Sequence, residues 1–157
     1  MTNPENQELL IKQKVKSWRT LASQQSDYFI KFALEYFAFN ALLRLKYLSI
    51  EEKFRRDRIL INRLKDCANC EQVISAEAIG ELKTLLDEKP LKNLTRNKNI
   101  KIKDNKDWEN IVESVYWLRN NLFHGHKGYN TIERDQKLVE AGYKILKDID
   151  DYWLSFK

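Results

Sequence analysis

One apolar stretch, YFIKFALEYFAFNALL at residues 28–43, constrains the fold of this chain more than any other feature. Lys31, Glu35 and Asn40 interrupt it, and the other side chains are aliphatic or aromatic on nearly every side of a helix. A helix that is apolar over most of its circumference must be covered on several sides. The polar interruptions distinguish it from a membrane span, which needs about 20 predominantly apolar residues. The stretch therefore predicts a central, buried helix that continues to about Leu48.

Other segments of the chain also favour helices. The chain has four glycines and two prolines among 157 residues, so few positions interrupt a helix. Helix start signals occur at Ser26 or Asp27, in the capping box SIEE at 49–52, and at Thr131. Apolar residues recur at helical spacing in five further segments, which cover approximately residues 6–23, 49–66, 75–89, 108–123 and 131–156. The sequence predicts an all-α fold, an antiparallel bundle of about six helices in one domain covering residues 1–157.

The charge of the chain permits an anionic partner without requiring one. The formal net charge is +5 and the isoelectric point is about 9.1. The N-terminal sequence MTNPENQELLIKQKVK lacks the apolar core of a signal peptide. We therefore expect a soluble cytoplasmic protein that does not associate with membranes.

Cys67 and Cys70 form a CxxC motif in the sequence DCANC. A tetrahedral zinc site needs four ligands, and the chain has no second CxxC; the two histidines could complete a site, but their spacing does not indicate one. A thioredoxin-like role would need a βαβ setting, which the sequence lacks. We expect two reduced cysteines near a helix end, with no metal and no cofactor.

The segment LKNLTRNKNIKIKDNKD, residues 91–107, is strongly basic and has no sustained periodicity apart from a brief alternation at NIKIK. It is interpreted as a solvated loop that includes at most a short hairpin. The alternative is a flexible basic arm for a polyanion, because neutralising phosphates supplies much of the affinity for nucleic acids.

A cluster of polar residues marks the end of the helix predicted at 108–123, in the sequence YWLRNNLFHGHKGYN. Arg119, Asn120 and Asn121 occupy its last turn, and His124 follows just before Gly125, a residue suited to ending a helix. At about 100° per residue, Asn120 and His124 lie close to one face, while Arg119 lies further round.

These residue types suit phosphodiester chemistry. Histidine changes charge near neutral pH and can transfer a proton, and arginine offers a fork of donors that matches phosphate oxygens. A symmetric dimer would supply a second histidine to one pocket. Alternatively, His124 and Lys127 could simply stabilise a helix C-terminus, but this does not explain Asn120 and Asn121, which are poor helix formers.

The sequence RNNLFHG, Arg119 to Gly125, resembles the R-x(4–6)-H signature of the HEPN superfamily (higher eukaryotes and prokaryotes nucleotide-binding domain). The upstream EYFAFNALLRLKY is similar to the first core helix of many such domains. The resemblance implies a metal-independent ribonuclease, often a toxin or defence effector, that acts from a dimer cleft with the ribose 2′-OH as nucleophile. Arg119 would then hold the scissile phosphate, His124 would act as general base or acid, and Asn120 would position Arg119 or the phosphate.

Further residues are candidates for binding the substrate. In similar domains the first core helix lines the cleft, which implicates Asn40 and, less directly, Glu35; a core amide satisfied by neighbours is the alternative for Asn40. Asn121, His126 and Lys127 are added from the motif region. HEPN toxins paired with a nucleotidyltransferase antitoxin commonly carry a tyrosine two residues after the histidine, where this chain has His126. That residue is either a second proton carrier or an RNA-facing side chain.

The sequence therefore supports one main functional hypothesis and two alternatives. The main hypothesis is a homodimeric endoribonuclease that cleaves RNA and is controlled by an antitoxin or another regulatory protein. The first alternative is a non-catalytic HEPN module that binds nucleotide, RNA or a partner protein. The second is a structural helical adaptor without affinity for RNA.

Overall fold

A computed structural model describes residues 3–48, 56–67, 69–93, 98–123 and 132–155 of the protein. The predicted all-α fold is confirmed, because helices make up most of the described chain. The described residues form α1 (Pro4–Gln24), α2 (Tyr28–Tyr47), α3 (Asp57–Lys65), the short 3-10 helix η2 (Cys70–Val73), α4 (Ala76–Glu88), α5 (Trp108–Phe123) and α6 (Ile132–Ser155), with strands β1 (Leu91–Asn93) and β2 (Lys98–Ile100) between α4 and α5.

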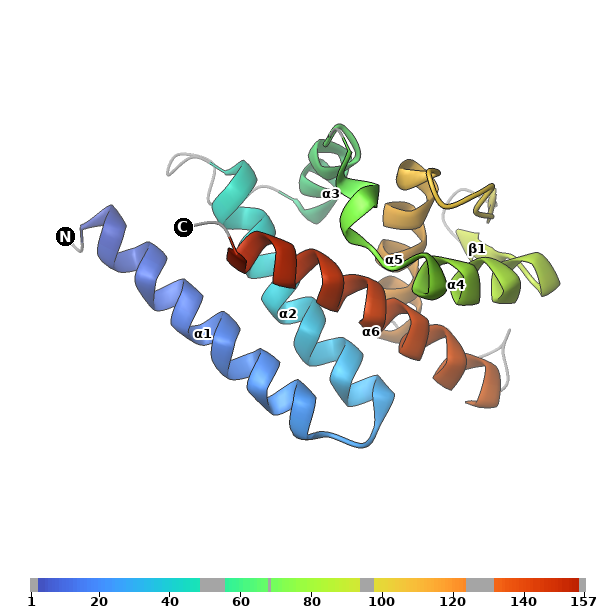
Figure 1. Ribbon diagram of the computed structural model, residues 1–157, viewed down its shortest axis with the longest axis horizontal. Coiled ribbons are helices and arrows are strands. Elements are labelled where there is room, and N and C mark those ends of the chain that lie inside the picture. Colours follow the sequence, from blue (N-terminus) through green and yellow to red (C-terminus); the bar gives the residue numbers. More distant parts are fainter. Residues whose placement is uncertain (1–2, 49–55, 68, 94–97, 124–131, 156–157) are drawn as a thin grey trace.

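The central position of α2 is also confirmed. α1 runs antiparallel along one side of α2, and α6 crosses it on another (Figure 1). Phe39 of α2 stacks on Trp153 of α6 with 5.7 Å between ring centroids, and Trp18 of α1 contacts Phe37 with 6.1 Å between centroids. The buried residues of α2 are Phe32, Glu35, Tyr36, Ala38, Phe39, Leu42 and Leu43.

The helix start signals agree with the structure where it describes them. Asp27 Oδ1 accepts a hydrogen bond from the Phe29 backbone at 2.8 Å, and Ser75 Oγ accepts one from Ala78 at 3.0 Å. The predicted helix at 49–66 begins later than expected, since Arg56 is the N-cap and has extended backbone angles. The sequence here, EEKFRRDR at 51–58, is almost entirely charged, so it contains no apolar pattern that would indicate where the helix begins. The capping box at 49–52 and the cap at 131 lie outside the described residues.

The basic segment at 91–107 is anchored to the fold by a short hairpin. β1 and β2 pair antiparallel, with Leu91 opposite Ile100. Ile100 and Ile102 are buried, whereas Lys101 and Lys103 are exposed. The alternation at NIKIK was therefore the informative signal, because it alternates buried and solvated side chains along an extended chain.

The cysteines differ from the expectation. Cys67 and Cys70 form a disulfide with their Cα atoms 5.8 Å apart, at the junction of α3 and η2. Asn69 adopts a left-handed conformation (φ 60°), which turns the chain between the two residues. Within the described ranges, no group of three or more His, Cys, Asp or Glu side chains is placed to hold a metal ion.

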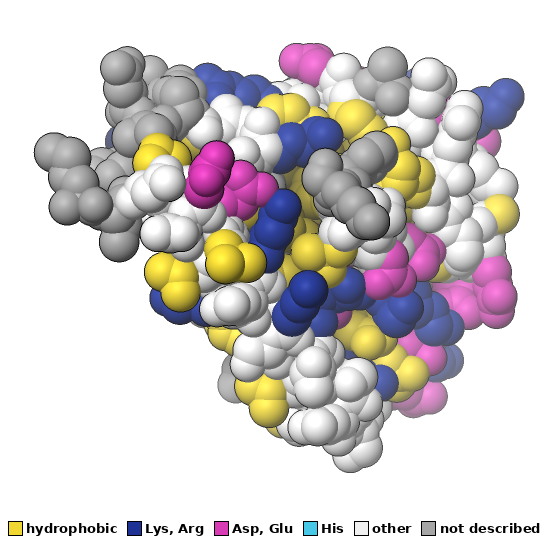
Figure 2. Space-filling view, turned by 60° about the vertical axis from the view of Figure 1, so that its left-hand side comes forward, with side chains coloured by type: hydrophobic (Ala, Val, Ile, Leu, Met, Phe, Trp, Pro, Cys, Tyr) yellow, Lys and Arg dark blue, Asp and Glu magenta, His cyan; other side chains and the backbone are white. Residues whose placement is uncertain are grey.

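The surface mixes charged and apolar side chains. On the face shown in Figure 2, Lys and Arg side chains gather near the centre with hydrophobic side chains among them, and several acidic side chains lie towards the margins. None of the helices in the described part of the chain combines the length and apolarity needed to cross a lipid bilayer.

Gly142 marks a place where α6 lies close to side chains of α2 and α5. A Cβ atom at Gly142 would lie 2.7 Å from Leu118 Cδ2 and 2.9 Å from Phe32 Cε2. A Cβ atom added at Gly80, in α4, would have no neighbouring atom within 4 Å beyond its own stretch of helix. There is therefore room for a side chain at Gly80 but not at Gly142.

We expect Gly142→Ala and Gly80→Ala to change the free energy of unfolding in opposite directions. Alanine at Gly80 should raise it by about 0.5–1 kcal/mol, because alanine favours helix more than glycine does. At Gly142 overpacking of about 1–3 kcal/mol should exceed that gain and lower the free energy of unfolding. Urea denaturation followed by circular dichroism measures both, and a stabilised Gly142→Ala variant would contradict the close approach.

Candidate functional site

Arg119 and Asn120 lie together near the end of α5. Arg119 Nη1 donates a hydrogen bond to Asn120 Oδ1 at 2.8 Å, and Asn120 is buried. A buried amide that accepts this bond limits the orientations open to the guanidinium group. The structure thus brings together two of the residues that the sequence analysis placed in the site.

The Arg119 guanidinium reaches α2 and α3. Its central carbon lies 5.5 Å from the ring centroid of Tyr36, and its Nη2 lies 3.6 Å from Asp57 Oδ2. The other oxygen of Asp57 accepts a hydrogen bond from Arg44 Nη2 at 2.7 Å. We refer to Tyr36, Arg44, Asp57, Arg119 and Asn120 as the arginine cluster. It joins three helices around two guanidinium groups and one carboxylate.

Asn40 lies on the same face of α2 as two residues of the arginine cluster. Tyr36, Asn40 and Arg44 are spaced four residues apart on α2, so they share one face of that helix. Asn40 is partly buried. This places the predicted asparagine between two members of the cluster along α2. Tyr36 and Arg44 were missed by the sequence analysis, although the same spacing of polar groups in an apolar helix was visible there.

The remaining residues of the motif are described only in part. Asn121 is partly buried, and its Oδ1 accepts no hydrogen bond within the described residues. His124, His126 and Lys127 lie outside the described residues, and so does the predicted helix stop at Gly125.

Burial raises the pKa of Tyr36 well above its usual value, although the positive charge of Arg119 opposes the shift. The phenol is therefore neutral at physiological pH. Its ring offers Arg119 a π face, an arrangement that stabilises a cation. Tyr36 can orient Arg119 in this way but cannot serve as a base.

A separate set of contacts holds α3 against α5. Arg58 donates to both oxygens of Glu113 at 2.8 Å, and Lys65 also pairs with Glu113. Burial alone would raise the pKa of Glu113, but hydrogen bonds from Lys65, Arg58 and Trp117 lower it. The carboxylate is thus ionised and fully engaged in linking the two helices. Arg58 also lies over the ring of Tyr116, 4.5 Å from its centroid.

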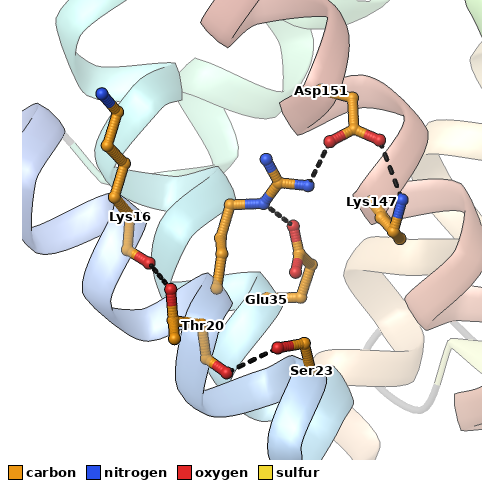
Figure 3. A network of polar contacts seen from close by, with 7 residues as sticks. Lys16, Thr20, Ser23, Glu35, Lys147 and Asp151 are labelled. Carbon is orange, nitrogen blue, oxygen red and sulfur yellow. Dashed lines mark hydrogen bonds and ion pairs between the residues drawn. The ribbon is translucent and has the colours of Figure 1, made fainter.

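Glu35 belongs to a different polar network, drawn in Figure 3. It is buried and accepts a hydrogen bond from Arg19 Nε at 2.7 Å. Arg19 Nη2 also donates to Asp151, which pairs on its other side with Lys147 at 2.9 Å. The structure therefore does not bring Glu35 to the arginine cluster, because it projects about 100° away from Tyr36 around α2.

Asp150 is fully buried beside Glu35. Burial raises the pKa of Asp150 well above its usual value, and the neighbouring carboxyl of Glu35 raises it further, while Arg19 opposes the shift. Burial and a like charge nearby both disfavour the ionised form of a carboxyl group. The carboxyl oxygens of Asp150 accept no hydrogen bond from the described residues, whereas Glu35 accepts one from Arg19. The bond from Arg19 explains why Glu35 is tolerated in the apolar stretch.

We expect the raised pKa of Asp150 to make the free energy of unfolding depend on pH. A carboxyl with a raised folded-state pKa contributes stability below its unfolded pKa of about 3.9, and that contribution is lost as the pH rises through the folded pKa. The free energy of unfolding of Asp150→Asn should therefore increase relative to that of the wild type as the pH rises from about 4. Urea denaturation across a pH series measures this difference.

The adjacent Asp151 provides a matched control. Burial would raise its pKa, but hydrogen bonds from Arg19 and Lys147 lower it. Its contribution to stability is present above the unfolded pKa and is lost as the pH falls through the folded one. The free energy of unfolding of Asp151→Asn should therefore increase relative to that of the wild type as the pH falls. Parallel pH profiles for the wild type and both variants would refute these assignments.

Comparison of the chain with protein-family models, with curated proteins and with solved structures found no match.

Proposed function

We propose that the protein is a metal-independent endoribonuclease of the HEPN type. The observation that carries the proposal is the position of Arg119 on the last turns of α5, where Asn120 holds it beside α2 and α3. His124 follows Arg119 by five positions in the sequence. An anchored arginine followed within a few residues of sequence by a histidine is the pattern that the resemblance to HEPN ribonucleases implies.

The reaction we propose uses the RNA itself as nucleophile. The ribose 2′-oxygen forms a bond to the adjacent phosphorus as the bond from phosphorus to the 5′-oxygen breaks, leaving a 2′,3′-cyclic phosphate and a 5′-hydroxyl. One histidine takes the proton of the 2′-hydroxyl, and an acid returns a proton to the departing 5′-oxygen. Arg119 stabilises the negative charge that develops on the phosphoryl oxygens.

A homodimer would complete this chemistry. The motif supplies one His124 per chain, whereas the reaction uses a base and an acid. A two-fold axis near the end of α5 would bring two Arg119–His124 pairs to one cleft. We further propose a cytoplasmic toxin or antiviral defence effector, held in check by an antitoxin or another regulatory protein, because unrestrained RNA cleavage would harm the cell.

The non-catalytic module is the alternative. It is favoured by the ion pair between Arg119 and Asp57, which already neutralises part of the charge of this arginine. In that case the cluster would bind nucleotide, RNA or a protein partner without cleaving it. The two functions differ in whether a product forms.

We expect His124→Ala to reduce RNA cleavage by about 100-fold or more, because the variant loses a proton carrier. Arg119→Ala should cause a loss of about 100- to 1,000-fold by removing transition-state stabilisation. Total tRNA and a short synthetic RNA, both incubated with EDTA, provide the measurement, and the termini of the products are identified in the same experiment. Lys14→Ala, an exposed cation on α1, is the control for charge loss and should cleave normally.

Each other outcome decides between the alternatives. Cleavage retained by both variants would show that the motif only ends a helix. Cleavage abolished by EDTA would assign the activity to a metal-dependent site. A folded wild type that binds RNA without cleaving it would support the non-catalytic module.

A further inference from the structure

The carboxylate of Asp57 is bound by two arginines from two other helices. Arg44 of α2 approaches one oxygen at 2.7 Å, and Arg119 of α5 approaches the other at 3.6 Å. The three side chains are 25% (Asp57), 32% (Arg44) and 24% (Arg119) exposed, so solvent and solutes can reach them. The carboxylate therefore bridges two converging guanidinium groups at an accessible place.

Guanidinium groups bind carboxylates and phosphates with the same fork of donors. A carboxylate in the first turn of α3 is also favoured by the helix dipole. The dipole accounts for Asp57 but not for the convergence of Arg44 and Arg119. Two guanidinium groups that converge on one carboxylate have the geometry to bind a phosphate group in its place.

We propose that Arg44 and Arg119 form a binding pair for a nucleic-acid phosphodiester, and that Asp57 occupies this pair in the free protein. This inference rests on the proposed function and adds two residues to it. Arg44 is a second phosphate-binding residue. Asp57 is a built-in competitor that the nucleic acid must displace, so it weakens binding.

The structure allows Asp57 to leave without unfolding α3. Arg58 and Lys65 hold α3 to Glu113 of α5, and Trp108 Nε1 donates to the backbone oxygen of Leu64 at 2.9 Å. None of these contacts involves Asp57. Rotation of one side chain is therefore sufficient, and it breaks only partly exposed ion pairs, which are weak interactions. The same contacts should keep Asp57→Asn folded.

The test measures binding of a fluorescein-labelled oligodeoxyuridylate by anisotropy at low salt. This probe carries phosphodiesters but has no 2′-hydroxyl, so cleavage through that group cannot affect the result. Asp57→Asn should tighten binding by about three- to tenfold, and Arg44→Gln should weaken it by a similar factor. In the Arg44→Gln background, Asp57→Asn should give a smaller gain, because half of the pair is missing.

Asp151→Asn is the matched control. Asp151 also holds an arginine, Arg19, but in the network of Figure 3 at the junction of α1 and α6. This variant changes the net charge by the same amount and should leave binding within about twofold of the wild type. Equal tightening by both variants would reduce the effect to net charge and overturn the proposal. Unchanged or weaker binding by a folded Asp57→Asn variant would also overturn it.

The outcome separates this inference from the proposed function. If Asp57→Asn binds the oligonucleotide more tightly but the wild type cleaves no RNA, the phosphate-binding site is supported and the ribonuclease function is ruled out. If cleavage requires Arg119 and His124 but substitution of Arg44 and Asp57 leaves binding unchanged, the ribonuclease function is supported and the proposed phosphate-binding pair is ruled out.

Discussion

The burial of α2 on several sides is the constraint on which the rest of the structure depends. A helix in this position buries its aromatic and aliphatic side chains readily, but each polar group it carries must find a partner from a neighbouring helix. Glu35 is hydrogen-bonded to Arg19 of α1, and Arg44 is hydrogen-bonded to Asp57 of α3. The polar residues of α2 thereby determine which neighbours it can have and in which register.

The two polar networks on α2 have opposite physical characters. Glu35 and Asp150 are buried, and burial raises the pKa of Asp150. The arginine cluster is partly exposed, and two of its guanidinium groups converge on one carboxylate. The first arrangement suits a structural fastening, whereas the second suits exchange of one anion for another. This contrast is why we assign binding to the arginine cluster and not to the larger set of charges around Arg19.

The sequence predicted the helices well because their apolar periodicity is strong, and α5 matches its predicted limits. It placed the start of α3 too early, since the extended backbone of Arg56 cannot be read from the sequence, and it missed the pairing of the cysteines, which depends on a left-handed turn at Asn69. In the candidate site, helical spacing placed Arg119 further round α5 than Asn120, and only the HEPN resemblance suggested that Asn120 positions Arg119, to which it is hydrogen-bonded. The contact with Asp57 was not predictable, because it joins helices whose packing depends on the whole core.

The aromatic residues around α3 have a spectroscopic consequence. Trp117 donates its indole N–H to Glu113, the same carboxylate that receives Arg58 and Lys65 from α3. Trp108 is hydrogen-bonded to the last turn of α3 through Leu64. Two of the four indoles in the chain are thus tied to the position of one short helix. Intrinsic fluorescence can therefore follow α3 without any added label.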